Sequence, residues 1–141
     1  DGIYSKDASS LTYAKLLLLA QEEIQKGCSV ILDATYSSRH QRSEVLRLAK
    51  DMEINLMFVE CMCPESVLKE RLVKREATPS VSDARLHHFQ QIKARFEPLN
   101  EVRDETHIRV DTERSLGESM EHILFQDYLL ESMQTAKATK R

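Results

Sequence analysis

Three short candidate strands, at residues 28–33, 56–61 and 108–111, alternate with longer segments that have helical periodicity. The first run shows almost no alternation of apolar and polar residues, and it ends in a carboxylate, Asp33. A continuous apolar run of this length is typical of a strand covered on both faces of a parallel sheet. Strands separated by helices therefore predict an α/β layered fold with a largely parallel sheet.

The helical segments carry recognisable start and stop signals. Ser38 and Gln41 have the spacing of a capping box, and Pro64 fits the first position of a helix. Pro79 cannot easily continue a helix, because it lacks a backbone donor. The expected helices run from Ser9 or Ser10 to about Lys26, from Ser38 to about Met52, from Pro64 to about Arg75, from Ser82 or Asp83 to Phe96, and from Leu116 to about Met133.

Length and charge limit the classes of protein that fit. A chain of 141 residues suffices for one compact domain, which we expect to span residues 1–134, with a flexible tail over 135–141. The net charge of -3 does not favour nucleic acid as a partner. No apolar run approaches the ~20 residues that a membrane span requires, so no membrane is expected. The three cysteines, all within or beside predicted buried strands, favour a reducing, cytoplasmic compartment.

The first candidate site feature is Asp33-Ala34-Thr35, which leaves the carboxyl end of the first predicted strand. Ligands of open parallel sheets collect at this edge. A carboxylate there can bind Mg²⁺ or accept a proton from an alcohol. Alternatively, Asp33 caps a loop, and its position alone leaves both interpretations open.

The second feature is a pair of arginines, Arg71 and Arg75, four residues apart on one helix face. Like charges at this spacing repel weakly, but an anion between them makes the pair favourable, and arginine suits phosphate oxygens. A solvated helix face is the alternative. The third feature is the polar loop at residues 78–85, which could be a mobile lid over the active-site edge or a simple helix start.

Taken together, the motifs resemble those of predicted P-loop kinases of the AAA-like family, with gluconate kinase, zeta toxin and polynucleotide kinase as more distant relatives. The likeness rests on short motifs in a specific order over nearly the whole chain. These are Gly2-Ile3-Tyr4-Ser5, Tyr13, Ala20, the run from Gly27 to Thr35 that contains Ser-Val-Ile-Leu-Asp-Ala-Thr, Arg42, Leu48-Ala49, Arg71-Leu72-x-x-Arg75, Val81-Ser82-Asp83-Ala84-Arg85 and Phe96-Glu97-Pro98.

This resemblance implies a role for each matched residue. Asp33, with Thr35 beside it, would lie at the nucleotide-phosphate and metal site, with ATP and Mg²⁺ as cofactors of the intact domain. Arg71 and Arg75 would belong to the lid and face the ATP phosphates. Arg39 and Arg42 would lie near the phosphoryl acceptor. The resemblance does not name the acceptor beyond a small-molecule hydroxyl.

The sequence departs from the family at its most diagnostic motif. The family begins with a strand and a Gly-x-x-x-x-Gly-Lys-Ser/Thr loop that holds the phosphates, and none of the glycines here stands in such a motif. The Asp-x-x-Arg segment that usually follows this loop and supplies the presumed general base is absent too. The expected fold is therefore an incomplete P-loop NTPase-like three-layer fold, and this stretch alone should be inactive. A missing central strand would leave unpaired edges, through which a homodimer could form.

Three functional hypotheses remain open at this point. The first is part of an ATP-dependent kinase for a small-molecule hydroxyl. The second is a non-catalytic binding or regulatory module of the same descent. The third is polynucleotide 5′-hydroxyl phosphorylation, which the acidic net charge does not favour.

Overall fold

The computed structural model describes residues 6–76 and 89–138. The chain divides into two compact units, residues 1–55 and residues 56–141, and each is described here by itself. The motifs expected at residues 2–5 and 81–85 lie outside the described residues. The predicted boundary at residue 134 stays a prediction, although the last helix extends beyond it to Ala138.

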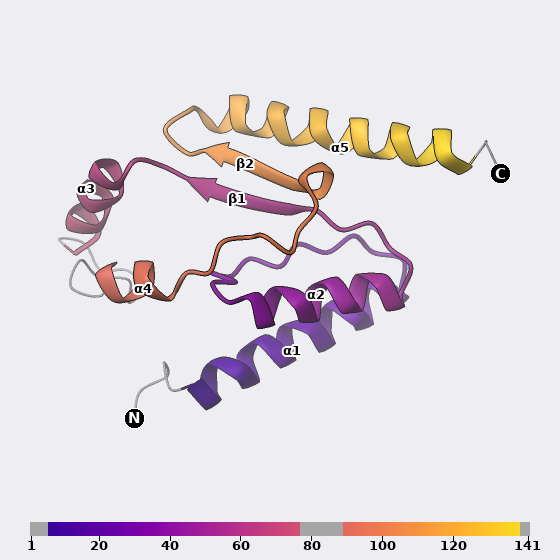
Figure 1. Ribbon diagram of the computed structural model, residues 1–141, viewed down its shortest axis with the longest axis horizontal. Coiled ribbons are helices and arrows are strands. Elements are labelled where there is room, and N and C mark those ends of the chain that lie inside the picture. Colours follow the sequence, from indigo (N-terminus) through magenta and orange to yellow (C-terminus); the bar gives the residue numbers. More distant parts are fainter. Residues whose placement is uncertain (1–5, 77–88, 139–141) are drawn as a thin grey trace. The chain divides into compact units, whose positions relative to one another are not determined.

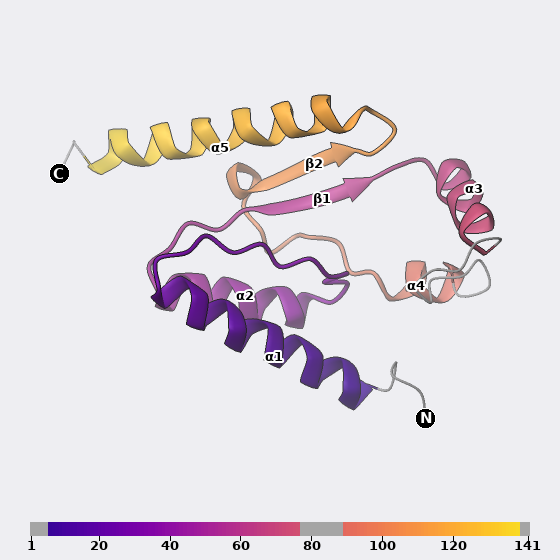
Figure 2. The same ribbon diagram turned by 180° about the vertical axis from the view of Figure 1, so that it is seen from behind.

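The first unit consists of two helices that pack together, α1 (Lys6–Gln25) and α2 (Arg39–Asp51). Figure 2 shows them side by side, with an extended segment running back between their ends. Buried Ala20 of α1 and buried Val45 and Ala49 of α2 form the apolar core of this unit. The turn after α1 uses Gly27 at φ 84°, a left-handed conformation that glycine adopts without a steric cost.

The start of α2 confirms the predicted capping box. The Ser38 side chain accepts a hydrogen bond from the Gln41 backbone N–H, and the Gln41 side chain accepts one from the Ser38 N–H. Two helix-terminal donors that no backbone carbonyl could satisfy are thereby paired. This cap fixes where the chain leaves the Asp33 segment and enters the helix.

The strand predicted at residues 28–33 is not formed, and that prediction is wrong. The segment is extended but carries no strand pairing in the described part of the chain. Ile31 is 94% exposed, whereas a strand covered on both faces would bury it. A strand requires a neighbour for its backbone groups, and an apolar pattern alone does not supply one.

The second unit contains a parallel pair of strands, β1 (Phe58–Met62) and β2 (His107–Asp111). Phe58 pairs with His107 and Met62 with Asp111, so the two carboxyl ends coincide. Figure 1 shows both arrows pointing the same way, with α5 (Leu116–Ala138) running back along β2. The strands predicted at residues 56–61 and 108–111 are therefore confirmed, with ends that differ by at most two residues, and their pairing is parallel, as expected for most of the sheet.

Three shorter elements complete this unit: α3 (Glu65–Glu76), α4 (Phe89–Arg95) and a 3-10 turn, η2 (Asp104–Thr106). Leu72 of α3, Phe89 of α4 and Val102 are buried together with Ile108 and Val110 of β2. The mixed helices and parallel strands are consistent with the predicted α/β class. The expectation that the cysteines are buried is wrong, because Cys28 and Cys61 are exposed and Cys63 is half-buried.

Candidate functional site

The carboxyl ends of β1 and β2 are joined by Thr112, the first residue after β2. Its backbone N–H donates to the Met62 carbonyl oxygen at 2.8 Å, and its hydroxyl donates to the same oxygen at 3.1 Å. Met62 is the last residue of β1, so Thr112 extends the pairing of the sheet by one position. This is the edge at which parallel α/β sheets bind their ligands.

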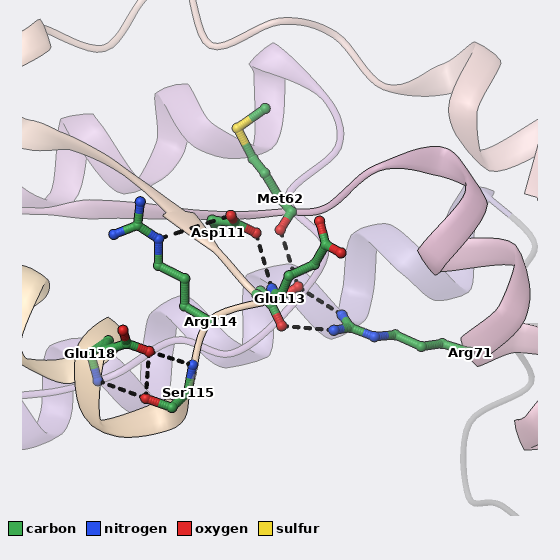
Figure 3. Close-up of polar contacts among 8 residues, drawn as sticks. Met62, Arg71, Asp111, Glu113, Arg114, Ser115 and Glu118 are labelled. Carbon is green, nitrogen blue, oxygen red and sulfur yellow. Dashed lines mark hydrogen bonds and ion pairs between the residues drawn. The ribbon is translucent and has the colours of Figure 1, made fainter.

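Arg71, a predicted phosphate-binding residue, reaches this edge from α3. Its Nη1 donates to the Thr112 hydroxyl oxygen and its Nη2 to the Thr112 carbonyl oxygen, both at 2.7 Å. Figure 3 shows the Arg71 guanidinium directed toward the end of the sheet near Met62. The Arg71 side chain is exposed on α3, yet both of its terminal nitrogens are hydrogen-bonded to Thr112. The structure therefore brings one of the two predicted lid arginines to the carboxyl ends of the parallel strands.

The loop that follows Thr112 is organised by its own polar side chains (Figure 3). The Glu113 N–H donates to the Asp111 carboxylate at 3.0 Å. Glu118 accepts bonds from the N–H and the hydroxyl of Ser115 at the start of α5, and these bonds lower the pKa of Glu118. A cavity of about 250 Å³ lies between the end of β2 and the first turns of α5. Arg109, Arg114 and His122 line it together with Asp111 and Glu118, so its charge is mixed.

Arg75, the second predicted phosphate ligand, lies in the last turn of α3 and is exposed. It follows Arg71 by four residues, so the two share one side of the helix. The same helix carries an ion pair between Glu70 and Lys74 at 2.7 Å, which lowers the pKa of Glu70. The phosphate-binding role of Arg75 stays a prediction.

The beginning of α3 is tied to α4 by a small charged cluster around Phe89. Glu65 binds Lys69 at 2.7 Å and Lys93 at 2.5 Å, and both ammonium groups lie about 6 Å from the centre of the Phe89 ring. The hydrogen bonds from Lys69 and then Lys93 lower the pKa of Glu65 to about 2. This cluster fixes the helix that carries Arg71 relative to α4.

The other predicted site residues lie in the first unit: Asp33 and Thr35 in the segment between α1 and α2, and Arg39 and Arg42 on α2. Asp33 is exposed, and its expected role at the metal site stays a prediction. Thr35, two residues later, has its hydroxyl oxygen 2.8 Å from the Tyr13 hydroxyl oxygen of α1. The sequence indicated Tyr13 only as part of a family motif. Its contact with Thr35 shows that it holds the segment that follows Asp33.

Tyr36 closes the Asp33 segment in a strained conformation. Its φ of 41° lies in the left-handed region, which is uncommon for a residue with a side chain. Three contacts hold it there. Its N–H donates to the Tyr13 hydroxyl at 3.2 Å. Its ring packs edge-on against the Tyr13 ring, with the ring centres 5.0 Å apart. Its carbonyl oxygen accepts a hydrogen bond from the Arg42 guanidinium at 2.8 Å.

Arg42 therefore has a different setting from the one expected. It is 1% exposed, and its guanidinium binds the Tyr36 carbonyl from α2. In this position it supports the segment that carries Asp33 and Thr35. Arg39, at the first position of α2, is exposed, as an acceptor-side residue would be.

Two further properties of the described residues bear on cofactors and membranes. Within residues 6–76 and 89–138, no group of three or more His, Cys, Asp or Glu side chains is arranged to hold a metal ion. A Mg²⁺ ion that is bound mainly by nucleotide phosphates and water needs only one or two protein carboxylates, and Asp33 fits that role. In the same ranges, the helices are too short or too polar to cross a bilayer.

Comparison with known proteins identifies a family for this chain. The model of the AAA domain family matches residues 1–99. The search of curated proteins gave no match, nor did the search of solved structures. The matched region includes Asp33, Arg71 and Arg75, and it ends before β2. Because this match covers well over half of the 141 residues, the chain belongs to the AAA domain family, a family of P-loop nucleotide-binding domains.

Proposed function

We propose that this chain contributes the lid and acceptor-side residues of an ATP-dependent phosphotransferase that acts on a small-molecule hydroxyl. One observation carries the proposal: Arg71 is tied to the carboxyl end of two parallel strands in a chain of the AAA domain family. Nucleotides bind at this edge of parallel α/β sheets, and arginine is well suited to phosphate oxygens. The proposal also holds that these 141 residues alone do not transfer a phosphoryl group.

Each residue has a role that its environment supports. Arg71 and Arg75 are exposed on α3 and would bind the ATP phosphates. Asp33 is an exposed carboxylate that would hold Mg²⁺ or accept the proton of the acceptor hydroxyl, with Thr35 beside it. When bound, Mg²⁺ neutralises charge on the transferred phosphoryl group.

The two basic residues of α2 belong to the acceptor side in different ways. Arg39 is exposed and would contact the acceptor directly. Arg42 is buried and acts through the Tyr36 carbonyl, which it binds, so it would fix the loop against which the acceptor docks. Positioning of this kind supplies much of the catalysis in phosphoryl transfer.

The sequence contains no Gly-x-x-x-x-Gly-Lys-Ser/Thr motif, so the affinity of these residues for ATP should be low. We expect a dissociation constant in the millimolar range, about -4 kcal/mol of binding free energy. The test is a titration of the ¹⁵N-labelled chain with Mg-ATP, followed through the arginine side-chain signals. Arg71 should shift, and Arg71→Ala should abolish saturation.

Arg47→Ala is the matched control, because Arg47 is an exposed arginine of α2 whose ion pair with Glu44 is remote in sequence from both arginines of α3. This variant should bind Mg-ATP as the wild type does. Micromolar binding that survives Arg71→Ala would refute the proposal, as would the absence of any shift at Arg71.

A non-catalytic binding or regulatory module is the second candidate function. The observation in its favour is that the sequence contains no Gly-x-x-x-x-Gly-Lys-Ser/Thr motif. This candidate predicts no response of Arg71 to Mg-ATP at any concentration. The same titration therefore separates the two functions.

A further inference from the structure

We propose that Thr112 is a positioning residue for Arg71: its hydroxyl and its carbonyl hold the guanidinium at the carboxyl end of β1 and β2 and leave further N–H donors for an anion. The inference rests on the proposed function only in taking that anion to be a polyphosphate. The geometry of the two residues stands independently of it.

The Thr112 side chain is itself held in place by β1. Its N–H and its hydroxyl both donate to the Met62 carbonyl oxygen. A threonine hydroxyl has one hydrogen and two lone pairs. With the hydrogen directed to Met62, a lone pair is left to accept from Arg71, and the 2.7 Å distance to Nη1 matches this assignment.

The Arg71 guanidinium is held at both of its terminal nitrogens. Nη1 binds the Thr112 hydroxyl and Nη2 binds the Thr112 carbonyl, so one residue orients the whole planar group. A guanidinium has five N–H donors, and these two bonds occupy two of them. The remaining donors allow Arg71 to bind an anion without leaving Thr112.

Prior orientation of Arg71 makes anion binding more favourable. A long, exposed side chain loses rotamer freedom when it is ordered by a ligand. If Thr112 has already ordered it, that loss does not reduce the affinity for the ligand. Removing the hydroxyl should therefore weaken anion binding by about two- to tenfold, even though the hydroxyl does not touch the anion.

The test compares three variants of the full 141-residue chain. Thr112→Val removes the hydroxyl and keeps the carbonyl, and Thr112→Ser restores the hydroxyl. Thr106→Val is the matched control, because the Thr106 hydroxyl donates to the Arg103 carbonyl at 3.2 Å and takes no part in the Arg71 contacts. Amide signals of Ile108 and Val110 report whether β2 remains paired.

The primary measurement is the ¹⁵N spectrum of the Arg71 guanidinium, assigned with Arg71→Lys. In the wild type, Thr112→Ser and Thr106→Val, we expect separate Nη1 and Nη2 signals, because rotation of the group is hindered. In Thr112→Val we expect the two signals to merge. Merged signals in the wild type, or separate signals in Thr112→Val with β2 still paired, would overturn the inference.

The second measurement is the affinity for inorganic tripolyphosphate, followed at the same signals. Weaker binding by Thr112→Val with recovery in Thr112→Ser supports the positioning role. Tighter binding by Thr112→Val would mean that Thr112 competes with the anion, and the inference would fail. If no variant binds tripolyphosphate while the guanidinium signals behave as expected, the proposed function fails and the positioning of Arg71 by Thr112 stands.

Discussion

The Tyr13 hydroxyl oxygen lies 2.8 Å from the hydroxyl oxygen of Thr35, a residue 22 positions later in the chain. The same phenol accepts a hydrogen bond from the Tyr36 N–H at 3.2 Å. One side chain of α1 thus holds two consecutive residues of the segment that follows Asp33. Within the described residues, these hydrogen bonds to Tyr13 hold the segment in place without any strand pairing.

Tyr13→Phe should therefore destabilise the first unit. The change removes two hydrogen bonds, each worth about 1 kcal/mol, so we expect the free energy of unfolding to fall by about 1–2 kcal/mol. Urea denaturation provides the measurement. Tyr128→Phe is the control, because Tyr128 is 66% exposed and its loss should change stability by less than about 0.5 kcal/mol.

Tyr36→Phe should have the opposite effect from Tyr13→Phe. Within the described residues, the Tyr36 hydroxyl is buried without a hydrogen-bond partner. Replacing such a group with hydrogen should leave stability unchanged or raise it by up to about 1 kcal/mol. A loss larger than 1 kcal/mol in the urea midpoint analysis would show that the hydroxyl has a partner in solution.

The same variant should also change the response to alkaline pH. Burial, and then the neighbouring Tyr13, raise the pKa of Tyr36 above its ordinary value of 10.0. The folded protein therefore holds this proton more tightly than the unfolded chain, and stability falls as the pH rises above about 10. Tyr36→Phe should lose stability less steeply over that range.

Arg42→Met tests whether the buried guanidinium supports the strained Tyr36 backbone. The variant leaves the Tyr36 carbonyl without its 2.8 Å donor, and we expect a loss of about 2–4 kcal/mol. Arg47→Met removes an arginine from the same helix whose ion pair with Glu44 is exposed, and it should cost less than about 1 kcal/mol. Equal losses in the two variants would contradict the supporting role of Arg42.

Glu65→Gln should reduce the sensitivity of the second unit to acid. The bonds from Lys69 and Lys93 lower the Glu65 pKa from 4.5 to about 2 in the folded state. Stability from this carboxylate is present above pH 4.5 and is lost as the pH falls toward 2. We compare melting temperatures at about pH 6 and about pH 2.5, which lie on either side of this range. Between these two pH values, the melting temperature of the wild type should fall more than that of Glu65→Gln. Glu23→Gln, which removes the carboxylate that pairs with Lys26, is the control in the other unit.

Local signals in the sequence predicted the starts of α2, α3 and α5 and two of the three strands. Helix α1 begins at Lys6, before the expected Ser9 or Ser10. The Ser38–Gln41 capping box and the short strand expected at residues 108–111 are both present in the structure. The capping box depends only on residues that are close in the chain, and the segment at 108–111 prefers an extended conformation that pairing with β1 then fixes. The run at residues 28–33 has the same preference, but a strand also needs a partner, and Ile31 remains exposed.

The sequence named individual candidate site residues, but it did not predict which residues they contact in the structure. Helical spacing selected Arg71, but its partner Thr112 lies 41 residues away, and no periodicity links the two. Thr112 directly follows the run at residues 108–111, so the rule that ligands collect at the carboxyl ends of strands could have found it. The resemblance placed Arg42 near the phosphoryl acceptor. Its burial at 1% exposure was not predicted, because buried arginines are rare and sequence pattern does not reveal them.

The bond between Thr112 and Met62 joins residues 50 positions apart and has a consequence for the order of folding. The helices involve only nearby residues, and they can form while the chain is still being synthesised. The parallel pairing of β1 and β2 must wait until residues 107–112 have emerged. The guanidinium of Arg71 consequently acquires its fixed orientation late, and a ribosome-bound chain that stops before Thr112 would carry every predicted phosphate ligand without an assembled binding edge.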